Sequence, residues 1–193
     1  MTFAFIRHGQ TDWNLERRMQ GGGSDIPLND TGREQAFEAI DVLAGTDWAA
    51  IVSSPLVRAR ETAAIVAAGL GIELGPTYEG LLERDYHAME GFDEAEARRR
   101  WPDRDYPGAE PLELVADRGV QALEQIAADY GDRNVIIVCH GTIIRFTLAR
   151  LAGEPIDSIL NGSVSTLERA PHGWQVLTVN GAPLAEAAGV DID

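Results

Sequence analysis

Residues 135–139 form an uninterrupted apolar run, Val-Ile-Ile-Val-Cys, which ends at His140 and Gly141. An apolar run of this length without alternation predicts a strand that is buried on both faces. Residues 2–6 and 48–53 have the same character, and segments with helical spacing of apolar residues separate the runs. Strands that alternate with helices predict a three-layer α/β/α sandwich with a mostly parallel sheet.

The remaining pattern predicts further elements. A short strand is expected near residues 71–75, and residues 163–169 and 174–179 predict a hairpin that forms an antiparallel edge. Helices are expected over about 31–45, 55–70, 92–101, 112–130 and 142–151. In the first helix, Thr31 and Glu34 have capping-box spacing, and the positions expected to face the core are Ala36, Phe37, Ile40 and Leu43. Prolines mark a linker with Asp103, Arg104 and Asp105 exposed, and a frayed tail is expected from Pro183.

Length and composition fit a single domain over residues 1–193. The formal net charge is −15, so we expect neither a nucleic-acid nor a membrane partner, because polyanions and anionic lipids are repelled. A small anionic ligand would need positive charge concentrated at its own site. The single cysteine, Cys139, permits no intrachain disulfide, the first apolar run stops at Arg7, and no stretch approaches transmembrane length. These features predict a cytoplasmic protein.

Polar side chains follow three of the expected strands. Arg7 and His8 come directly after the first, Arg58 shortly after the second, and His140 directly after the run at 135–139. Neighbouring parallel strands end at one edge of a sheet, where open α/β sheets bind ligands, so these side chains should converge. Removing a phosphoryl group needs an in-line nucleophile, cations for the nonbridging oxygens and a proton for the leaving oxygen. A neutral imidazole and arginines suit the first two tasks.

The pattern Arg-His-Gly-x-Thr-x-Trp-Asn at residues 7–14 resembles the signature of the histidine phosphatase superfamily, which includes phosphoglycerate mutases and many small phosphatases. Further stretches match that family in the same order, at residues 18–21, 27–32, 53–59, 82–86 and 138–145. Such ordered agreement is far more specific than one tripeptide. Mutases carry a longer insertion between the acid and the second histidine, whereas only 56 residues separate Glu83 from His140 here. The resemblance is therefore to the small phosphatase branch.

The resemblance also implies roles for individual residues. His8 matches the histidine that carries the phosphoryl group, and Glu83 matches the proton donor. Arg7, Arg58 and His140 match the phosphate pocket. Substrate contacts are expected from Thr11, Asn14, Gln20, Gly21 and Gly141. The family chemistry implies no metal and no cofactor, and the expected partner is a small phosphorylated metabolite, while the oligomeric state is left open.

These observations predict a metal-independent phosphomonoesterase that forms a phosphohistidine on His8, with Glu83 protonating the leaving oxygen. A phosphoglycerate mutase-type phosphotransferase is the alternative. A noncatalytic phospholigand-binding protein is the second alternative, disfavoured because all five expected catalytic residues are present. Glu79 and Glu90 are nearby rivals of Glu83 for the acid role.

Several other polar residues allow a structural interpretation. Cys139 is expected to be a buried structural residue, since neighbouring strand residues point to opposite faces. His172 is expected in an exposed turn, and arginines 98–100 on a solvated helix face. His87 either lines the substrate pocket or is exposed. The glycine-rich residues 20–25 predict a flexible loop that could fold over a ligand.

Overall fold

The computed structural model describes residues 1–184, and its seven-stranded sheet has the order β3-β2-β4-β1-β5-β6-β7. The strands are β1 (Thr2–Arg7), β2 (Trp48–Ser53), β3 (Glu73–Thr77), β4 (Asn134–Cys139), β5 (Val164–Ala170), β6 (Gly173–Val179) and β7 (Ala182–Pro183). Strands β3, β2, β4 and β1 pair in parallel, and β5, β6 and β7 extend the sheet antiparallel from β1. The predicted parallel sheet with an antiparallel edge is confirmed.

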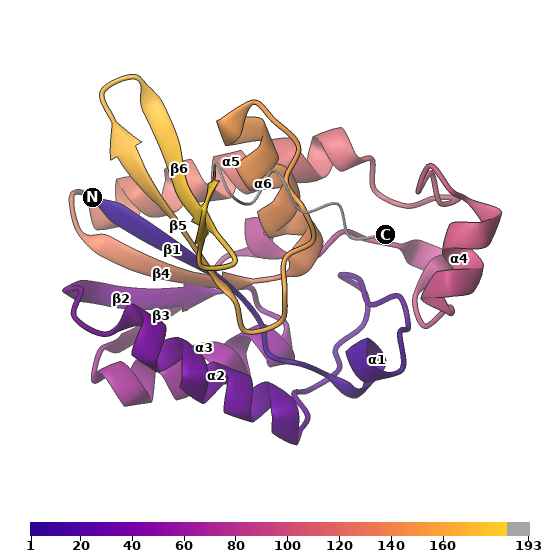
Figure 1. The fold of residues 1–193 in the computed structure, drawn as a ribbon, viewed down its shortest axis with the longest axis horizontal. Helices are drawn as coiled ribbons and strands as arrows, with labels where there is room; N and C mark the ends of the chain where they lie inside the picture. Colours follow the sequence, from indigo (N-terminus) through magenta and orange to yellow (C-terminus); the bar gives the residue numbers. More distant parts are fainter. Residues whose placement is uncertain (185–193) are drawn as a thin grey trace.

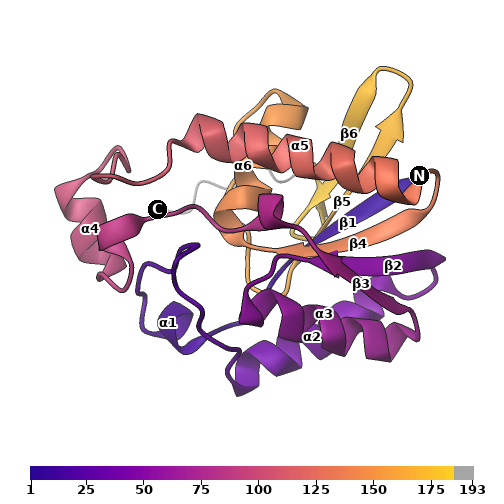
Figure 2. The same ribbon diagram turned by 180° about the vertical axis from the view of Figure 1, so that it is seen from behind.

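Helices cover both faces of the sheet (Figure 1). They are α1 (Asp12–Leu15), α2 (Asp30–Leu43), α3 (Val57–Leu70), α4 (Glu94–Arg100), α5 (Leu112–Tyr130) and α6 (Gly141–Ala152), with 3-10 turns η1 (Glu79–Leu81) and η2 (His87–Met89). Helices α2 and α3 lie on one face and α5 and α6 on the other, as the reverse view in Figure 2 also shows. Each face has its own buried apolar cluster. The three-layer α/β/α sandwich is confirmed.

The central strand β4 is apolar from Val135 to Cys139 because both of its faces are covered there. Residues 135–139 are all fully buried, with Ile137 packed on the α5 and α6 side and Ile136 on the α2 and α3 side. Burial at about 25 cal/mol per Å² of apolar surface makes such a strand a large favourable contribution to folding. Its pairing with β1 places Arg7 opposite Cys139, so the two strands end together.

Helix α2 differs from its prediction in two ways. Its N-cap is Asn29, whose side chain accepts a hydrogen bond from the Gly32 amide at 2.9 Å, so Thr31 is already inside the first turn and does not form the expected capping box with Glu34. Phe37 is 60% exposed rather than in the core. The buried stripe consists mainly of small side chains, Ala36 and Ala39 with Leu43, because α2 packs against α3 as well as the sheet.

The linker before α5 also differs from its prediction. Arg104 is half-buried rather than exposed, whereas Asp103 and Asp105 are exposed as expected. The Arg104 backbone has a positive φ of 58°, and its carbonyl oxygen accepts hydrogen bonds from the Arg84 guanidinium. The tail predicted to fray begins at Pro183, which pairs in β7, and residues 185–193 lie outside the described part of the chain. No helix within residues 1–184 is both long and apolar enough to cross a bilayer.

The orientation of α2 gives a stability prediction. We expect Leu43→Ala to lower the free energy of unfolding by about 2–5 kcal/mol, because it removes a core side chain and leaves a cavity. Phe37→Ala on the same helix is the matched control and should cost less than about 1 kcal/mol, since that ring is mostly solvated. Urea denaturation followed by circular dichroism measures both. Equal losses would show that α2 is rotated from this arrangement.

Candidate active site

The ends of three parallel strands meet at one edge of the sheet. The His8 amide donates to the Cys139 carbonyl at 3.0 Å, and the Ser54 amide donates to the Val138 carbonyl at 2.9 Å. This backbone pairing brings the His8 and His140 rings to 5.1 Å between centroids. The Arg58 Nε donates to His140 Nδ1 at 3.2 Å. The predicted convergence of His8, Arg58 and His140 is confirmed.

His8 is held in one tautomer by its own backbone. Its Nδ1 lies 2.7 Å from the Gly9 carbonyl oxygen, which only accepts, so Nδ1 carries the proton and Nε2 keeps its lone pair. Burial, then the charges of Arg58 and Arg7, hold the pKa of His8 well below 6.5. The ring is therefore a neutral imidazole with a free lone pair on Nε2.

Gly9 is needed because the backbone approaches another segment closely. A Cβ at Gly9 would lie 2.0 Å from the Gly32 carbonyl oxygen, so no larger residue fits without displacing the start of α2. The Gly9 amide donates to Thr62 Oγ1 at 3.1 Å, and that hydroxyl donates to the Arg58 carbonyl at 2.8 Å. Thr62 thus links the His8 turn to α3.

His140 takes the opposite tautomer. Because Arg58 donates to Nδ1, the proton is on Nε2, which lies 2.8 Å from Ser54 Oγ. Burial, then the charges of Arg58 and Arg7, hold the pKa of His140 well below 6.5. Ser54 belongs to the matched stretch at residues 53–59, but its contact with His140 became visible only in the structure.

Arg58 is fully buried and organises the glycine-rich loop. Its guanidinium donates to the Ser24 carbonyl at 2.7 Å and to the Gly21 carbonyl at 3.1 Å. Burial lowers the pKa of Arg58 to about 10, opposed by the nearby carboxylates of Glu83, Asp25 and Glu90. The side chain remains a cation at neutral pH.

The loop of residues 20–25 is held at several points rather than free. The Asp25 carboxylate accepts from the Val57 amide at 2.7 Å at the start of α3, and Glu90 accepts from the Gly23 amide at 2.9 Å and from the Ser24 hydroxyl. Glu90, one rival for the acid role, is therefore committed to this loop. Glu79, the other rival, is exposed on η1.

Glu83 lies on the loop between η1 and η2 and is 7% exposed. One carboxylate oxygen accepts from the amides of Arg84 (2.9 Å) and Ile143 (3.1 Å), and the other accepts from Thr142 (2.9 Å). The carboxylate therefore sits at the N-terminus of α6, where the exposed amides and the helix dipole favour it. Of the three rival carboxylates, Glu83 is the one in the site.

A half-buried ion pair fixes the Glu83 loop from the side of α5. Arg118 on α5 donates to the carbonyls of Gly80 (2.9 Å) and Leu82 (2.7 Å) and binds Glu110 through both carboxylate oxygens. The bidentate geometry restricts Arg118 to one orientation. Neither Arg118 nor Glu110 was recognised as a functional candidate from the sequence. Arg118 binds backbone carbonyls, which every residue carries, so no sequence motif marks the contact.

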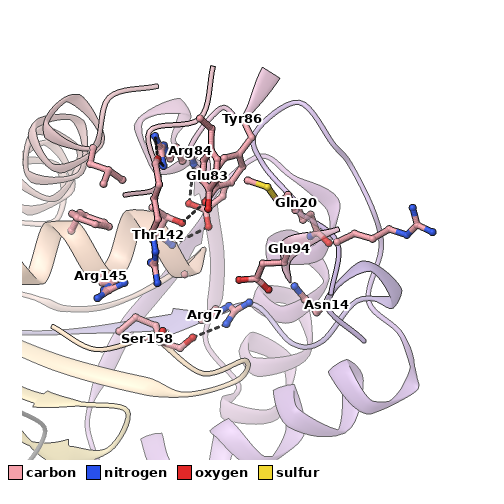
Figure 3. A pocket seen from close by; sticks show the side chains of 18 of the residues that line it. Arg7, Asn14, Gln20, Glu83, Arg84, Tyr86, Glu94, Thr142, Arg145 and Ser158 are labelled. Atoms are coloured by element: carbon pink, nitrogen blue, oxygen red, sulfur yellow. Dashed lines mark hydrogen bonds between the residues drawn. The ribbon is translucent and has the colours of Figure 1, made fainter. Parts of the chain in front are cut away.

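A cavity of about 180 Å³ opens beside these groups. Five predicted residues line it: Arg7, Asn14, Gln20, Glu83 and Gly141. Figure 3 shows Arg7, Asn14, Gln20 and Glu83 around this space. The other predicted residues are buried and are not part of the lining: His8, Thr11, Gly21, Arg58 and His140.

Two buried donors in this lining have no acceptor within residues 1–184. They are Arg7 Nε and Gln20 Nε2, while Arg7 Nη1 donates to the Ile159 carbonyl at 2.6 Å. Burial lowers the pKa of Arg7, opposed by Glu83, Glu94 and Tyr86. Unpaired buried donors are rare and costly. An anion bound in the cavity would supply the missing acceptors.

Asn14 and Thr11 build the local frame of the site. The Thr11 side chain caps α1 by accepting from the Asn14 amide, and Asn14 Oδ1 accepts from the Thr11 amide at 3.1 Å. Thr11 Oγ1 also donates to Gln20 Oε1 at 2.6 Å. This hydrogen bond fixes the orientation of the Gln20 amide group, whose Nε2 has no acceptor among the described residues.

The remaining candidates separate clearly. The His87 ring is 61% exposed, lies 3.3 Å from Asp85 and is not part of the cavity lining. Its φ of 49° places it in a conformation that favours glycine.

Arg99 and Arg100 pair with Glu96 on the solvated face as expected, but Arg98 reaches the cavity. Cys139 is fully buried, and burial raises the pKa of its thiol; His172 is exposed.

Fold, strand-end histidines and buried arginines together define a class of protein. Residues 3–182 match the histidine phosphatase superfamily (branch 1), and the chain belongs to this family. Its relatives in this family include phosphatases and phosphoglycerate mutase-like proteins.

Particular relatives cover most of the chain. It is 36% identical over 179 residues to the uncharacterized phosphatase PhoE of Bacillus subtilis, covering 91% of this chain and 92% of the relative. It is 30% identical over 183 residues to the metal-independent phosphoserine phosphatase of Arabidopsis thaliana, covering 88% and 76%. The solved structure of a mycobacterial glucosyl-3-phosphoglycerate phosphatase in complex with VO3 superposes with a TM-score of 0.83 at 28% identity, covering 93% of this chain and 98% of that one.

The two neutral histidines give a pH prediction. Their lowered pKa values mean that the unfolded chain binds protons below about pH 6.5 while the folded chain does not, so the free energy of unfolding should fall as pH drops from about 6.5 to 5. His8→Gln should make this fall shallower, by up to about 1.4 kcal/mol per pH unit. The measurement is urea denaturation at several pH values. The exposed His172→Gln is the control, and parallel slopes for both variants and the wild type would contradict the assignment.

Proposed function

We propose that this protein is a metal-independent phosphomonoesterase that acts through a phosphohistidine on His8. The observation that carries the proposal is the fixed His8 tautomer, a neutral ring with a free Nε2 beside two arginines in a buried site. The relatives' names support a phosphatase, and one of them is described as metal-independent. The arginines provide the positive charge that a metal ion supplies in other phosphatases.

In the first step, His8 Nε2 attacks the phosphorus atom in line with the leaving oxygen. The N–P bond forms, the P–O ester bond breaks, and its electron pair stays on the alcohol oxygen. Glu83, in its acid form, transfers a proton to that oxygen, so a neutral alcohol leaves. Arg7 and Arg58 stabilise the charge on the nonbridging oxygens.

In the second step, water attacks the phosphorus of the phosphohistidine. Glu83, now a carboxylate, takes a proton from the water as the new P–O bond forms and the N–P bond breaks. The electron pair of the N–P bond returns to Nε2, which regenerates neutral His8 and releases inorganic phosphate. The hydrogen bond from Nδ1 to the Gly9 carbonyl holds the ring in orientation throughout both steps.

The role of His8 is tested by phosphate release from a panel of small phosphomonoesters, with and without chelator. We expect release that resists the chelator and falls to background in His8→Ala, together with a phosphorylated His8 peptide in acid-free mass spectrometry of wild type quenched during turnover. His172→Ala is the control and should retain full activity, because that side chain is exposed in the β5–β6 turn, at the end of the sheet opposite Arg7 and His8.

Three other outcomes would count against the proposal. Release that persists in His8→Ala would remove the phosphohistidine mechanism. A phosphorylated His8 without net phosphate release would indicate a mutase-type transfer to a second acceptor. Binding of the esters without phosphorylation would indicate a noncatalytic phospholigand-binding protein.

The role of Glu83 is tested with leaving groups of different basicity. We expect Glu83→Gln to lower kcat about 10²–10⁴-fold for alkyl phosphates, because their alkoxide must be protonated as it leaves. For p-nitrophenyl phosphate, whose phenolate leaves without a proton, the loss in the phosphorylation step should be much smaller. Glu79→Gln is the control and should behave as wild type with both esters. A uniform loss across leaving groups in single-turnover phosphorylation would show that Glu83 acts only in positioning.

A further inference from the structure

The wall of the cavity carries much more positive charge than the rest of the chain. The chain has a formal net charge of −15 and contains no lysine, so all of its basic side chains other than histidine are arginines. Six of these arginines line the cavity, against the two carboxylates of Glu83 and Glu94. The six are Arg7, Arg18, Arg84, Arg98, Arg104 and Arg145. One phosphoryl group does not require so many cations.

Three of the six are already engaged within the protein. Arg84 donates to two backbone carbonyls and lies between two tyrosine rings, at 5.2 and 5.5 Å from their centroids. Arg18 and Arg98 each form an ion pair with a glutamate that is near in sequence. Arg7 belongs to the phosphate pocket of the proposed mechanism. These assignments leave Arg104 and Arg145.

Arg104 and Arg145 have no carboxylate within 4.0 Å in the part of the chain that the structure describes. Arg145 uses its Nε to donate to the Ile156 carbonyl at 2.5 Å, which orients the guanidinium and leaves its terminal nitrogens for other acceptors. Burial, then the positive charge of Arg104, lowers the pKa of Arg145. Two half-buried cations are therefore held near each other against their repulsion.

The two arginines reach the cavity from different elements. Arg145 extends from α6, about one turn after Gly141. Figure 3 shows it across the cavity from Asn14 and Gln20, with Arg7 between them. Arg104 comes from the linker, where its carbonyl is held by Arg84 and its backbone stays in the left-handed region. The aromatic rings of Tyr106 and Phe146 also line the wall.

We propose that Arg104 and Arg145 bind a second anionic group, a carboxylate or a second phosphate, of a small phosphomonoester whose scissile phosphate lies at Arg7 and His8. This inference rests on the proposed function for the position of the scissile phosphate. A cavity of about 180 Å³ is small for a ligand site, so only a few carbon atoms separate the two anionic groups. A neutral analogue offers neither guanidinium group an anionic partner, which makes the two arginines specificity determinants.

The test measures binding rather than turnover, so it does not depend on the reaction. Isothermal titration calorimetry with His8→Ala protein compares three ligands on one glycerol skeleton: glycerol 3-phosphate, 3-phosphoglycerate, which adds a carboxylate, and glycerol 1,3-bisphosphate, which adds a second phosphate. We expect at least one of the two ligands with a second anionic group, 3-phosphoglycerate or glycerol 1,3-bisphosphate, to bind about tenfold or more tightly than glycerol 3-phosphate. Whichever of the two binds better identifies the second group.

Variants of the two arginines test whether they cause the tighter binding of ligands that carry a second anionic group. Arg104→Gln and Arg145→Gln, each in the His8→Ala background, should reduce the preference about fivefold or more and change the affinity for glycerol 3-phosphate less than about twofold. Arg145→Lys should restore part of it, because it keeps the charge. Arg150→Gln is the matched control on α6, since Arg150 is exposed, pairs with Glu113 and Asp117, and does not line the cavity.

The outcomes separate the two proposals. Equal affinity for all three ligands, no binding of any of them, or a preference that survives both glutamine variants would overturn the second anion site. A preference that depends on Arg104 and Arg145 would support it even if wild type releases no phosphate, a result that would sink the proposed hydrolysis alone.

Discussion

The burial of the Arg58 cation is the constraint on which the rest of the site depends. A guanidinium that is removed from water must find fixed acceptors, and here they are the carbonyls of Gly21 and Ser24 and the Nδ1 atom of His140. The glycine-rich loop is therefore drawn onto α3, and His140 is locked in one tautomer. The same charge disfavours protonation of His8. One buried cation thus shapes the loop and orients one histidine, and together with burial it keeps the other histidine neutral.

Much of this architecture was predictable from the sequence, for identifiable reasons. Strands β2 and β4 are continuous apolar runs, and helix α5 has apolar residues at helical spacing, so the sequence pattern predicted all three elements. His8 and His140 follow such strands directly, and the parallel order of β2, β4 and β1 then brings them together. Glu83 was identified among rival carboxylates by resemblance, and the structure distinguishes it by its place at the start of α6.

The errors also have physical causes. Phe37 fits the helical spacing expected of a buried residue, but α2 packs closely on α3, so the small side chains of Ala36 and Ala39 are buried and Phe37 is exposed. Residues 20–25 are flexible by composition, yet they are anchored by groups distant in sequence, Arg58 and Glu90. Arg104 lines the cavity, and its backbone adopts a left-handed conformation that the composition of a charged linker does not predict. Such contacts depend on tertiary structure, and no local pattern contains them.

The groups of the proposed mechanism are divided between the two helical layers of the sandwich. Arg58 belongs to α3 on one face of the sheet, whereas Glu83 is held by the first amides of α6 on the other, and His8 lies at the sheet edge between them. Neither layer can detach while leaving a working set of groups behind. Local opening of either face therefore abolishes the site, so the lifetime of the active arrangement is limited by the less stable of the two faces.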